Sequence, residues 1–238
     1  MDLQETQTSM SFLPPGRVSL RSMTLSDVDD YMVWATDPEV ARFCTWEPCT
    51  SRDEAIKYIT DRVLTHPWLR AICIEDDRPI GYILIMAVDN IRKEIGYVLA
   101  RKYWGKGFAT EAVRLVTAEI FKEFPEIERV EALVDVENVG SQKVLEKVGF
   151  TREGVMRKFL YIKGSVRDTV MFSFLPTDTM NKTDDAVART NESTGVGGNV
   201  QADWLHKRSH HDFDEETGVR RRIKTNPWFV SQANNSCG

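Results

Sequence analysis

The order of strand-like and helix-like segments in this sequence predicts an α+β fold. Residues 69–74, 80–88 and 94–99 have the composition of strands and are separated by turn-forming clusters, which is typical of an antiparallel meander. The third of these strands passes through a glycine-bearing turn into a segment with apolar residues at helical spacing, 109–120. A further strand at 130–135 and a short helix follow.

The ends of the predicted domain add the remaining elements. Residues 18–21 form a first strand, and two strands at 156–162 and 167–174 form a last hairpin around Lys163 and Gly164. Capping pairs start two early helices: Thr24 with Asp27, to about residue 34, and Ser51 with Glu54, to about residue 63. The predicted order is therefore β-α-α-β-β-β-α-β-α-β-β.

Composition divides the 238 residues into three parts. Residues 1–16 are polar, end in two prolines and are expected to be a loose arm. Residues 17–176 are the predicted domain. Residues 177–238 form a tail, of which the first part, to about residue 201, is too poor in apolar residues to fold and is expected to be disordered.

The tail also carries three histidines and a basic run, Arg220 to Lys224. The histidines, His206, His210 and His211, lack spaced cysteines, so we expect no metal site. The basic run is interpreted as a solvated charged segment, with a nuclear-import or anion-binding patch as the alternative.

Charge and cysteine usage limit the class of protein. The net charge is −5 and the pI is about 5.5, which argues against a nucleic-acid-binding surface over the whole chain. The four cysteines include no CxxC pair, and neither a signal sequence nor a membrane span is evident. We expect a cytoplasmic protein, also able to be nuclear, that is a monomer or a homodimer.

The turn between the third strand and the following helix has the features of an anion site. Main-chain N–H groups at the start of a helix lack intrahelical partners, and the helix dipole places partial positive charge there. Gly105 and Gly107 permit positive φ and close approach, and Arg101, Lys102 and Lys106 add charge. The turn is interpreted as a pyrophosphate cradle; an ordinary tight surface turn is the alternative.

Two motifs in this part of the chain resemble the GNAT superfamily of acetyl-CoA-dependent N-acetyltransferases. YWGKGFATEA is similar to its acyl-CoA-binding signature, although Lys102 stands where the pattern has Arg or Gln. ENVGSQKVLEKVGFTREG, residues 137–154, matches N-x-x-S-x-x-x-L-x-x-x-G-F. Together they resemble the branch of ribosomal-protein alanine (RimJ/RimL-like) and spermidine acetyltransferases, over roughly residues 17–175.

The resemblance implies a GNAT fold, with a mixed, mostly antiparallel twisted sheet and helices on both faces. In it the strands 94–99 and 130–135 are parallel but diverge around acetyl-CoA, and no metal is needed. A bulge in the strand 94–99 is expected to aim one amide at the acetyl oxygen. The implied cofactor-binding residues are Tyr97, Val98, Leu99, Lys102, Trp104, Gly105, Lys106, Gly107, Phe108, Ala109, Thr110, Asn138 and Ser141.

The resemblance also suggests the proton-transfer groups. Many relatives use a tyrosine as the acid for the thiolate, but this chain has Leu145 there, so Ser141, one helical turn earlier, is the candidate acid. The alternative is that Ser141 is a helix-start residue whose hydroxyl only bonds the local backbone. Glu94 is the candidate base, with an exposed strand-end glutamate as the alternative.

The acceptor is expected to be a primary amine. Trp46 and Glu47, in a loop between the early helices, are candidate substrate-binding residues, unless the aromatic side chains there cap the core. Neutralising an α-amine at pH 7 costs roughly 1.1 kcal/mol and neutralising lysine roughly 4.6 kcal/mol, which favours a protein N-terminus over lysine. A small amine or polyamine stays open.

Two other functions are weighed against this one. A non-catalytic acyl-CoA-binding module would use the same cradle. A nucleotide-dependent oxidoreductase fits less well, because Thr110 occupies the third glycine position of a dinucleotide fingerprint and a second set of alternating elements is missing.

Overall fold

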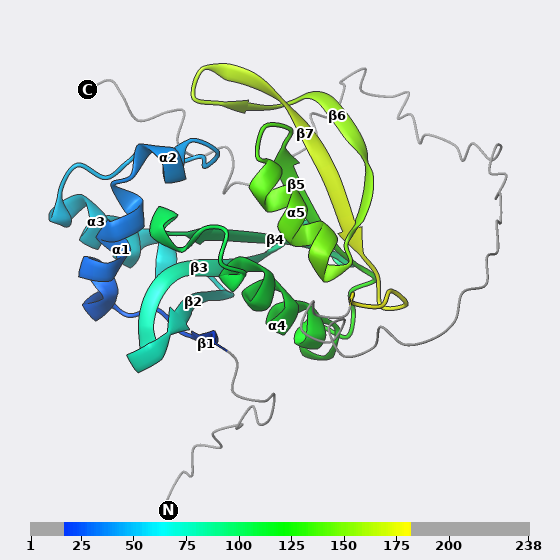
Figure 1. Cartoon of the computed structure of the whole chain (residues 1–238), viewed down its shortest axis with the longest axis horizontal. Helices are drawn as coiled ribbons and strands as arrows, with labels where there is room; N and C mark the ends of the chain where they lie inside the picture. Colours follow the sequence, from blue (N-terminus) through cyan, green and yellow to red (C-terminus); the bar gives the residue numbers. More distant parts are fainter. Residues whose placement is uncertain (1–16, 182–238) are drawn as a thin grey trace, which may run out of the picture. The chain divides into compact units, whose positions relative to one another are not determined.

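The computed structural model describes residues 17–181, and these residues build one seven-stranded sheet with helices on both faces (Figure 1). The strand order is β1-β2-β3-β4-β5-β7-β6. The strands are β1 (Ser19–Arg21), β2 (Leu69–Ile74), β3 (Arg78–Ala87), β4 (Arg92–Leu99), β5 (Arg129–Asp135), β6 (Thr151–Ile162) and β7 (Ser165–Phe174). The helices are α1 (Val28–Ala35), α2 (Pro38–Ala41), α3 (Arg52–Tyr58), α4 (Phe108–Glu123) and α5 (Val139–Val148). The predicted α+β fold, with a mostly antiparallel sheet, is confirmed.

Each face of the sheet has its own apolar core. Side chains of α4 and α5, such as Ile120 and Leu145, pack with Ile95 and Leu99 on one face. Helices α1 and α3 cover the other face, where Val98 lies at the edge of their cluster. Successive residues of β4 therefore face different helical layers, as the period of two in a strand requires.

The feature that positions the site is the pairing of β4 with β5. This is the parallel pair of the described sheet, whereas the other paired neighbours are antiparallel. The pairing covers residues 92–94 of β4 and 129–131 of β5. Beyond these three rungs the two strands separate, so that a gap opens between their C-terminal halves. The predicted divergence of these strands is thus present.

The local start and stop signals act as predicted. The Asp27 carboxylate accepts from Thr24 N at 2.8 Å, and Ser51 Oγ accepts from Glu54 N at 3.2 Å. The hairpin turn at Lys163 and Gly164 has positive φ at both residues. The second early helix is regular only to Tyr58, because residues 59–63 continue as a π-helical turn.

Two elements extend beyond their predicted bounds. Strand β6 starts at Thr151 rather than near residue 156, and its first part is mostly exposed, so it lacks the apolar alternation that marks a strand. Residues 177–181 belong to the domain rather than to the tail. Asn181 N donates to Val148 O at 3.0 Å, and Met180 packs against the core under α4 and α5.

The predictions for residues 1–16 and for the rest of the tail, including the three histidines and Arg220 to Lys224, lie outside the described residues. Within residues 17–181, none of the helices has both the length and the apolar composition that a membrane span requires. The same residues contain no group of three or more side chains able to hold a metal ion.

Candidate active site

The edge of β4 that faces the gap offers main-chain groups without a strand partner. Ala100 N donates to Ile80 O at 2.9 Å, and a Cβ on Gly81 would lie 2.0 Å from Val98 O, so Val98 and Ala100 direct their main chain toward β3. Because main-chain groups alternate sides along a strand, those of Tyr97 and Leu99 point into the gap. Of the three predicted residues of this strand, Tyr97 and Leu99 are therefore the ones whose main-chain groups face the gap.

The bulge expected in β4 is also wrong. The register between β3 and β4 runs without a shift from Gly81 with Leu99 to Ala87 with Lys93. The irregularity lies one strand further away, between β2 and β3 at Ile72 and Cys73. Glycine at position 81 allows the continuous register, because a side chain there would collide with Val98 O.

The turn between β4 and α4 has the geometry of an anion cradle. Gly105 and Gly107 have φ of 72° and 84°, and Gly107 is the N-cap of α4 without a side-chain cap. Both glycines are exposed, and a Cβ on Gly105 would meet no atom within 4 Å. The amides of residues 108–110 precede the first bonded amide, Glu111 N, which donates to Gly107 O at 3.0 Å. These amides are free to bind a phosphate.

The residues around the turn hold it in place and add charge. Trp104 Nε1 donates to Leu99 O at 2.8 Å, which ties the turn to the end of β4. Lys102 and Lys106 place their ammonium groups 5.0 and 5.8 Å from the Tyr103 ring centroid. Arg101 instead pairs with Asp37 at 2.9 Å, so its charge is compensated within the chain.

Arg17 is a cradle residue that the motif did not indicate. Its guanidinium lies 5.1 Å from the Phe108 ring centroid and pairs with Glu111 at 3.5 Å. A Cβ on Gly107 would come within 3.1 Å of this guanidinium, which places a cation at the start of α4. The ion pair of Arg17 with Glu111 joins two distant parts of the chain, and no local pattern predicts it.

Ser141 and Tyr97 form a hydroxyl pair between α5 and β4. The two hydroxyl oxygens are 2.7 Å apart, and burial raises the pKa of Tyr97. Asn138 Oδ1 accepts from Ser141 N at 3.1 Å and caps α5, as predicted. Because the Ser141 hydroxyl bonds a side chain on β4, the reading in which it only bonds the local backbone does not hold. Leu145 is fully buried in the core.

Glu94 lies in the last paired rung of β4, on the opposite face from Tyr97. Only 5% of its surface is exposed, so the reading of an exposed strand-end glutamate is wrong. Burial, reinforced by the neighbouring charge of Glu131, raises the pKa of the Glu94 carboxyl to about 8. A carboxyl with such a pKa can both take and release a proton near neutral pH.

The two predicted substrate-binding residues have different environments. Trp46 is 6% exposed and packs in the core of α1 and α3, so the core-capping alternative describes it. Glu47 is exposed and pairs with Lys163 of the β6–β7 turn at 3.3 Å. Lys163 Nζ also donates to Ala41 O at 2.9 Å, which joins this hairpin to the end of α2.

Comparison with known proteins identifies the family to which this chain belongs. The model of the acetyltransferase (GNAT) domain matches residues 17–151. The uncharacterized N-acetyltransferase p20 of Bacillus licheniformis is 38% identical over 173 residues, which cover 70% of this chain and 97% of p20. The uncharacterized N-acetyltransferase YoaA of Bacillus subtilis is 29% identical and covers 68% of this chain and 96% of its own length.

Solved structures give the same fold. A GNAT-family acetyltransferase from Bacillus anthracis superposes with a TM-score of 0.62 at 23% identity, covering 69% of this chain and 98% of that one. Spermidine N-acetyltransferase from Vibrio cholerae, in a complex with CoA and spermine, gives a TM-score of 0.56 at 20% identity, covering 67% and 95%.

Proposed function

Since this chain belongs to the GNAT acetyltransferase family and is an N-acetyltransferase, we propose that it transfers the acetyl group of acetyl-CoA to the α-amine of a protein N-terminus. The observation that carries the choice of acceptor is the buried carboxyl of Glu94, with a pKa of about 8. This value lies near the reference value of an α-amine, about 7.8, and far below that of lysine, about 10.4. Proton transfer from an α-amine to Glu94 is therefore nearly balanced in free energy.

The carboxylates beyond the diverging strands also favour this acceptor over a polyamine. A polycation needs uncompensated negative charge, but these carboxylates have basic partners within the chain. The pairs are Asp135 with Arg167 at 3.8 Å, Glu137 with Arg42 at 2.9 Å and Glu47 with Lys163 at 3.3 Å.

The branch of ribosomal-protein alanine acetyltransferases is the subgroup that we propose. The motif over residues 137–154 supports it. YdaF of Bacillus subtilis, a candidate ribosomal N-acetyltransferase by name, is 35% identical over 109 residues, which cover 45% of this chain and 59% of YdaF.

The cradle and the edge of β4 fit acetyl-CoA, which supplies the activated acetyl thioester. The free amides of α4 and the cations of Lys102, Lys106 and Arg17 would hold its diphosphate. The main-chain groups of Tyr97 and Leu99 would hold the acyl arm in the gap, where an N–H can donate to the carbonyl oxygen as negative charge develops on it. Holding both reactants in this geometry supplies much of the rate enhancement.

The two proton transfers of the reaction use side chains on opposite faces of β4. Glu94 takes a proton from the acceptor ammonium, directly or through a water molecule, and leaves a neutral amine. On the other face, the hydroxyl pair of Ser141 and Tyr97 donates a proton to the departing thiolate. Ser141 is the donor that we propose, with Tyr97 as its hydrogen-bonding partner.

Product analysis tests this function. The full chain is incubated with acetyl-CoA and a panel of peptides with free N-termini, the same peptides with blocked N-termini and internal lysines, and polyamines. Mass spectrometry should find acetylation of the free N-termini. Acetylation of polyamines alone would contradict the proposed acceptor, and binding of acetyl-CoA without any product would favour the non-catalytic module.

A further inference from the structure

A second buried glutamate faces Glu94 where β4 and β5 separate. Glu131 on β5 is the register partner of Glu94 in the last paired rung of the two strands. Partners in adjacent strands carry their side chains on the same face of the sheet. Glu131 is 4% exposed and Glu94 5%, so two carboxyl groups lie side by side with little access to water.

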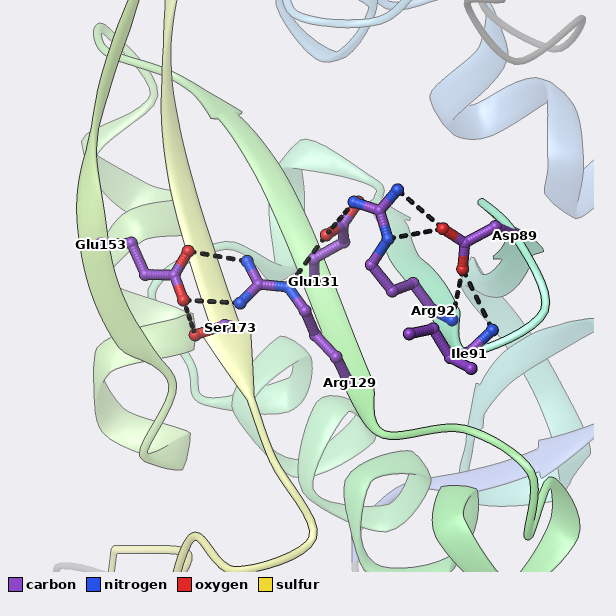
Figure 2. A network of polar contacts seen from close by, with 7 residues as sticks. All are labelled: Asp89, Ile91, Arg92, Arg129, Glu131, Glu153 and Ser173. Carbon is purple, nitrogen blue, oxygen red and sulfur yellow. Dashed lines mark hydrogen bonds and ion pairs between the residues drawn. The ribbon is translucent and has the colours of Figure 1, made fainter. Parts of the chain in front are cut away.

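Two arginines contact the carboxylate of Glu131 (Figure 2). Arg129 Nε donates to Glu131 Oε2 at 3.0 Å, and an Arg92 terminal nitrogen lies 3.6 Å from the same oxygen. Both arginines divide their charge with other carboxylates. Arg129 donates two bonds to Glu153, at 2.5 and 2.7 Å, and Arg92 bonds Asp89 at 2.8 Å. The carboxyl group of Glu131 is therefore fixed in place by two arginines that it shares with Glu153 and Asp89.

The Glu94 carboxyl makes no comparable contact with an arginine of the described residues. Among residues 17–181, no side chain hydrogen-bonds or ion-pairs with its carboxyl. The charged and polar groups on the surrounding strands are Arg92 on β4, Glu131 and Arg129 on β5, Glu153 on β6 and Ser173 on β7, whereas its partner on β3 is the apolar Met86. Glu131 is the neighbouring group that acts on the Glu94 carboxyl through its charge.

We propose that Glu131, fixed by Arg92 and Arg129 one rung across from Glu94, is a positioning residue for acetyl transfer that controls when Glu94 holds a proton. This inference rests on the role proposed for Glu94 as the base. A like charge nearby disfavours the ionised form, so Glu131 favours protonated Glu94, and the arginines weaken this effect. When the acceptor delivers its proton, an N–H bond breaks, an O–H bond forms on Glu94, and that proton later leaves to water.

The pH dependence of kcat/KM tests the proposal. Activity of the natural chain should rise with pH as Glu94 loses its proton. Glu131→Gln removes the like charge and should move the midpoint down by about one pH unit. Arg92→Met removes a positive charge beside Glu131 and should move the midpoint of the pH profile up. Glu119→Gln, which breaks an exposed ion pair with Lys122 on α4, is the matched control and should leave the midpoint unchanged.

A direct titration separates this inference from the proposed function. The Glu94 carboxyl is followed by carbon NMR, with its signal assigned by loss in Glu94→Gln, so that the measurement needs no activity. Opposite shifts in Glu131→Gln and Arg92→Met are expected. An unmoved titration would overturn the inference and leave the acetyltransferase function standing. Loss of activity at all pH values with an unmoved midpoint would show a merely structural role and overturn it as well.

If the NMR midpoint moves while the kinetic midpoint does not, Glu94 is not the base, and both the inference and that part of the mechanism fail. Absence of product from the natural chain at every pH would reject the proposed function, whatever the titration shows.

Discussion

At the scale of single residues, the site depends on side chains that alternate along one strand. Tyr97 reaches Ser141 on one face of β4, and Glu94 lies on the other. The thioester would lie between them, at the open edge of the same strand. An acid and a base can then act from opposite sides without exchanging their proton directly.

Ser141→Ala is expected to reduce kcat by about 100-fold if its hydroxyl protonates the thiolate, a typical effect of a general acid. The affinity for acetyl-CoA should change little. Steady-state kinetics and calorimetry measure the two quantities, with Ser165→Ala, an exposed serine at the start of β7, as the control. Tyr97→Phe combined with Ser141→Ala should cost less than the sum of the single changes, because the two groups act as a pair. Unchanged kcat in Ser141→Ala would exclude it as the acid.

The sequence predicted the residues of this site that belong to local patterns. Asn138, Gly105 and Gly107 are required by caps and turns that a few neighbouring residues define. The Tyr97 hydroxyl finds its partner 44 positions away, and the burial of Glu94 depends on a neighbouring strand, so neither follows from local spacing. Trp46 was expected to bind substrate because it lies in a loop, but its side chain is buried in the core.

At the scale of elements, glycines define both helices of the site. Gly107 begins α4, and Gly149 ends α5 with φ of 115°, as its position after an apolar helix predicts. The chain beyond β7 packs against this second glycine. A Cβ on Gly149 would come within 3.0 Å of Thr179 O and 3.2 Å of Asn181 N.

Gly149→Ala should therefore lower the free energy of unfolding by about 1–3 kcal/mol, through backbone strain and displacement of residues 179–181. Gly154→Ala is the matched control, since its Cβ would meet no atom within 4 Å and its φ is not positive. Urea denaturation measures both variants. Equal stability of the two would contradict the packing described for this segment.

Residues 177–181, which the sequence assigns to the tail, pack on the domain through contacts of this kind. Residues 177–181 are polar in composition and read as the start of the tail. They are held largely by hydrogen bonds, such as Asn181 Nδ2 to Glu146 O at 2.9 Å and Arg114 to the carbonyls of Lys147 and Asn181. Hydrogen bonds from side chains to distant carbonyl groups leave no signal in hydrophobicity.

At the scale of the whole molecule, the seven strands form one sheet in which β4 and β5 pair at their N-terminal ends and separate toward their C-terminal ends. The order of elements and the two motifs were enough to predict this topology. The polar network around Glu131 was not predictable, because it joins β4, β5, β6 and β7 through residues that are ordinary surface types in the sequence (Figure 2). It lies at the paired rungs beyond which β4 and β5 diverge.

Burial of Glu94 predicts a pH dependence of global stability. Its pKa is about 8 in the folded chain against an ordinary 4.5, so the folded state keeps a proton that the unfolded state releases in this interval. The contribution of Glu94 is most favourable below about pH 4.5 and is lost as the pH rises toward 8, by up to about 1.4 kcal/mol per pH unit. Glu94→Gln should remove this slope in urea denaturation between pH 5 and 8. A constant difference from the natural chain across that range would contradict it.

The central claim is that the turn before α4 holds the diphosphate of acetyl-CoA. Calorimetric titration of acetyl-CoA into Gly105→Asp tests it most directly, with Gly164→Asp as the control. The two glycines have φ of 72° and 74° and open space around them, so that the two changes impose similar strain. We predict that Gly105→Asp abolishes binding, because its carboxylate occupies and repels the phosphate site, and that Gly164→Asp binds like the natural chain. Unchanged affinity in Gly105→Asp would contradict the account.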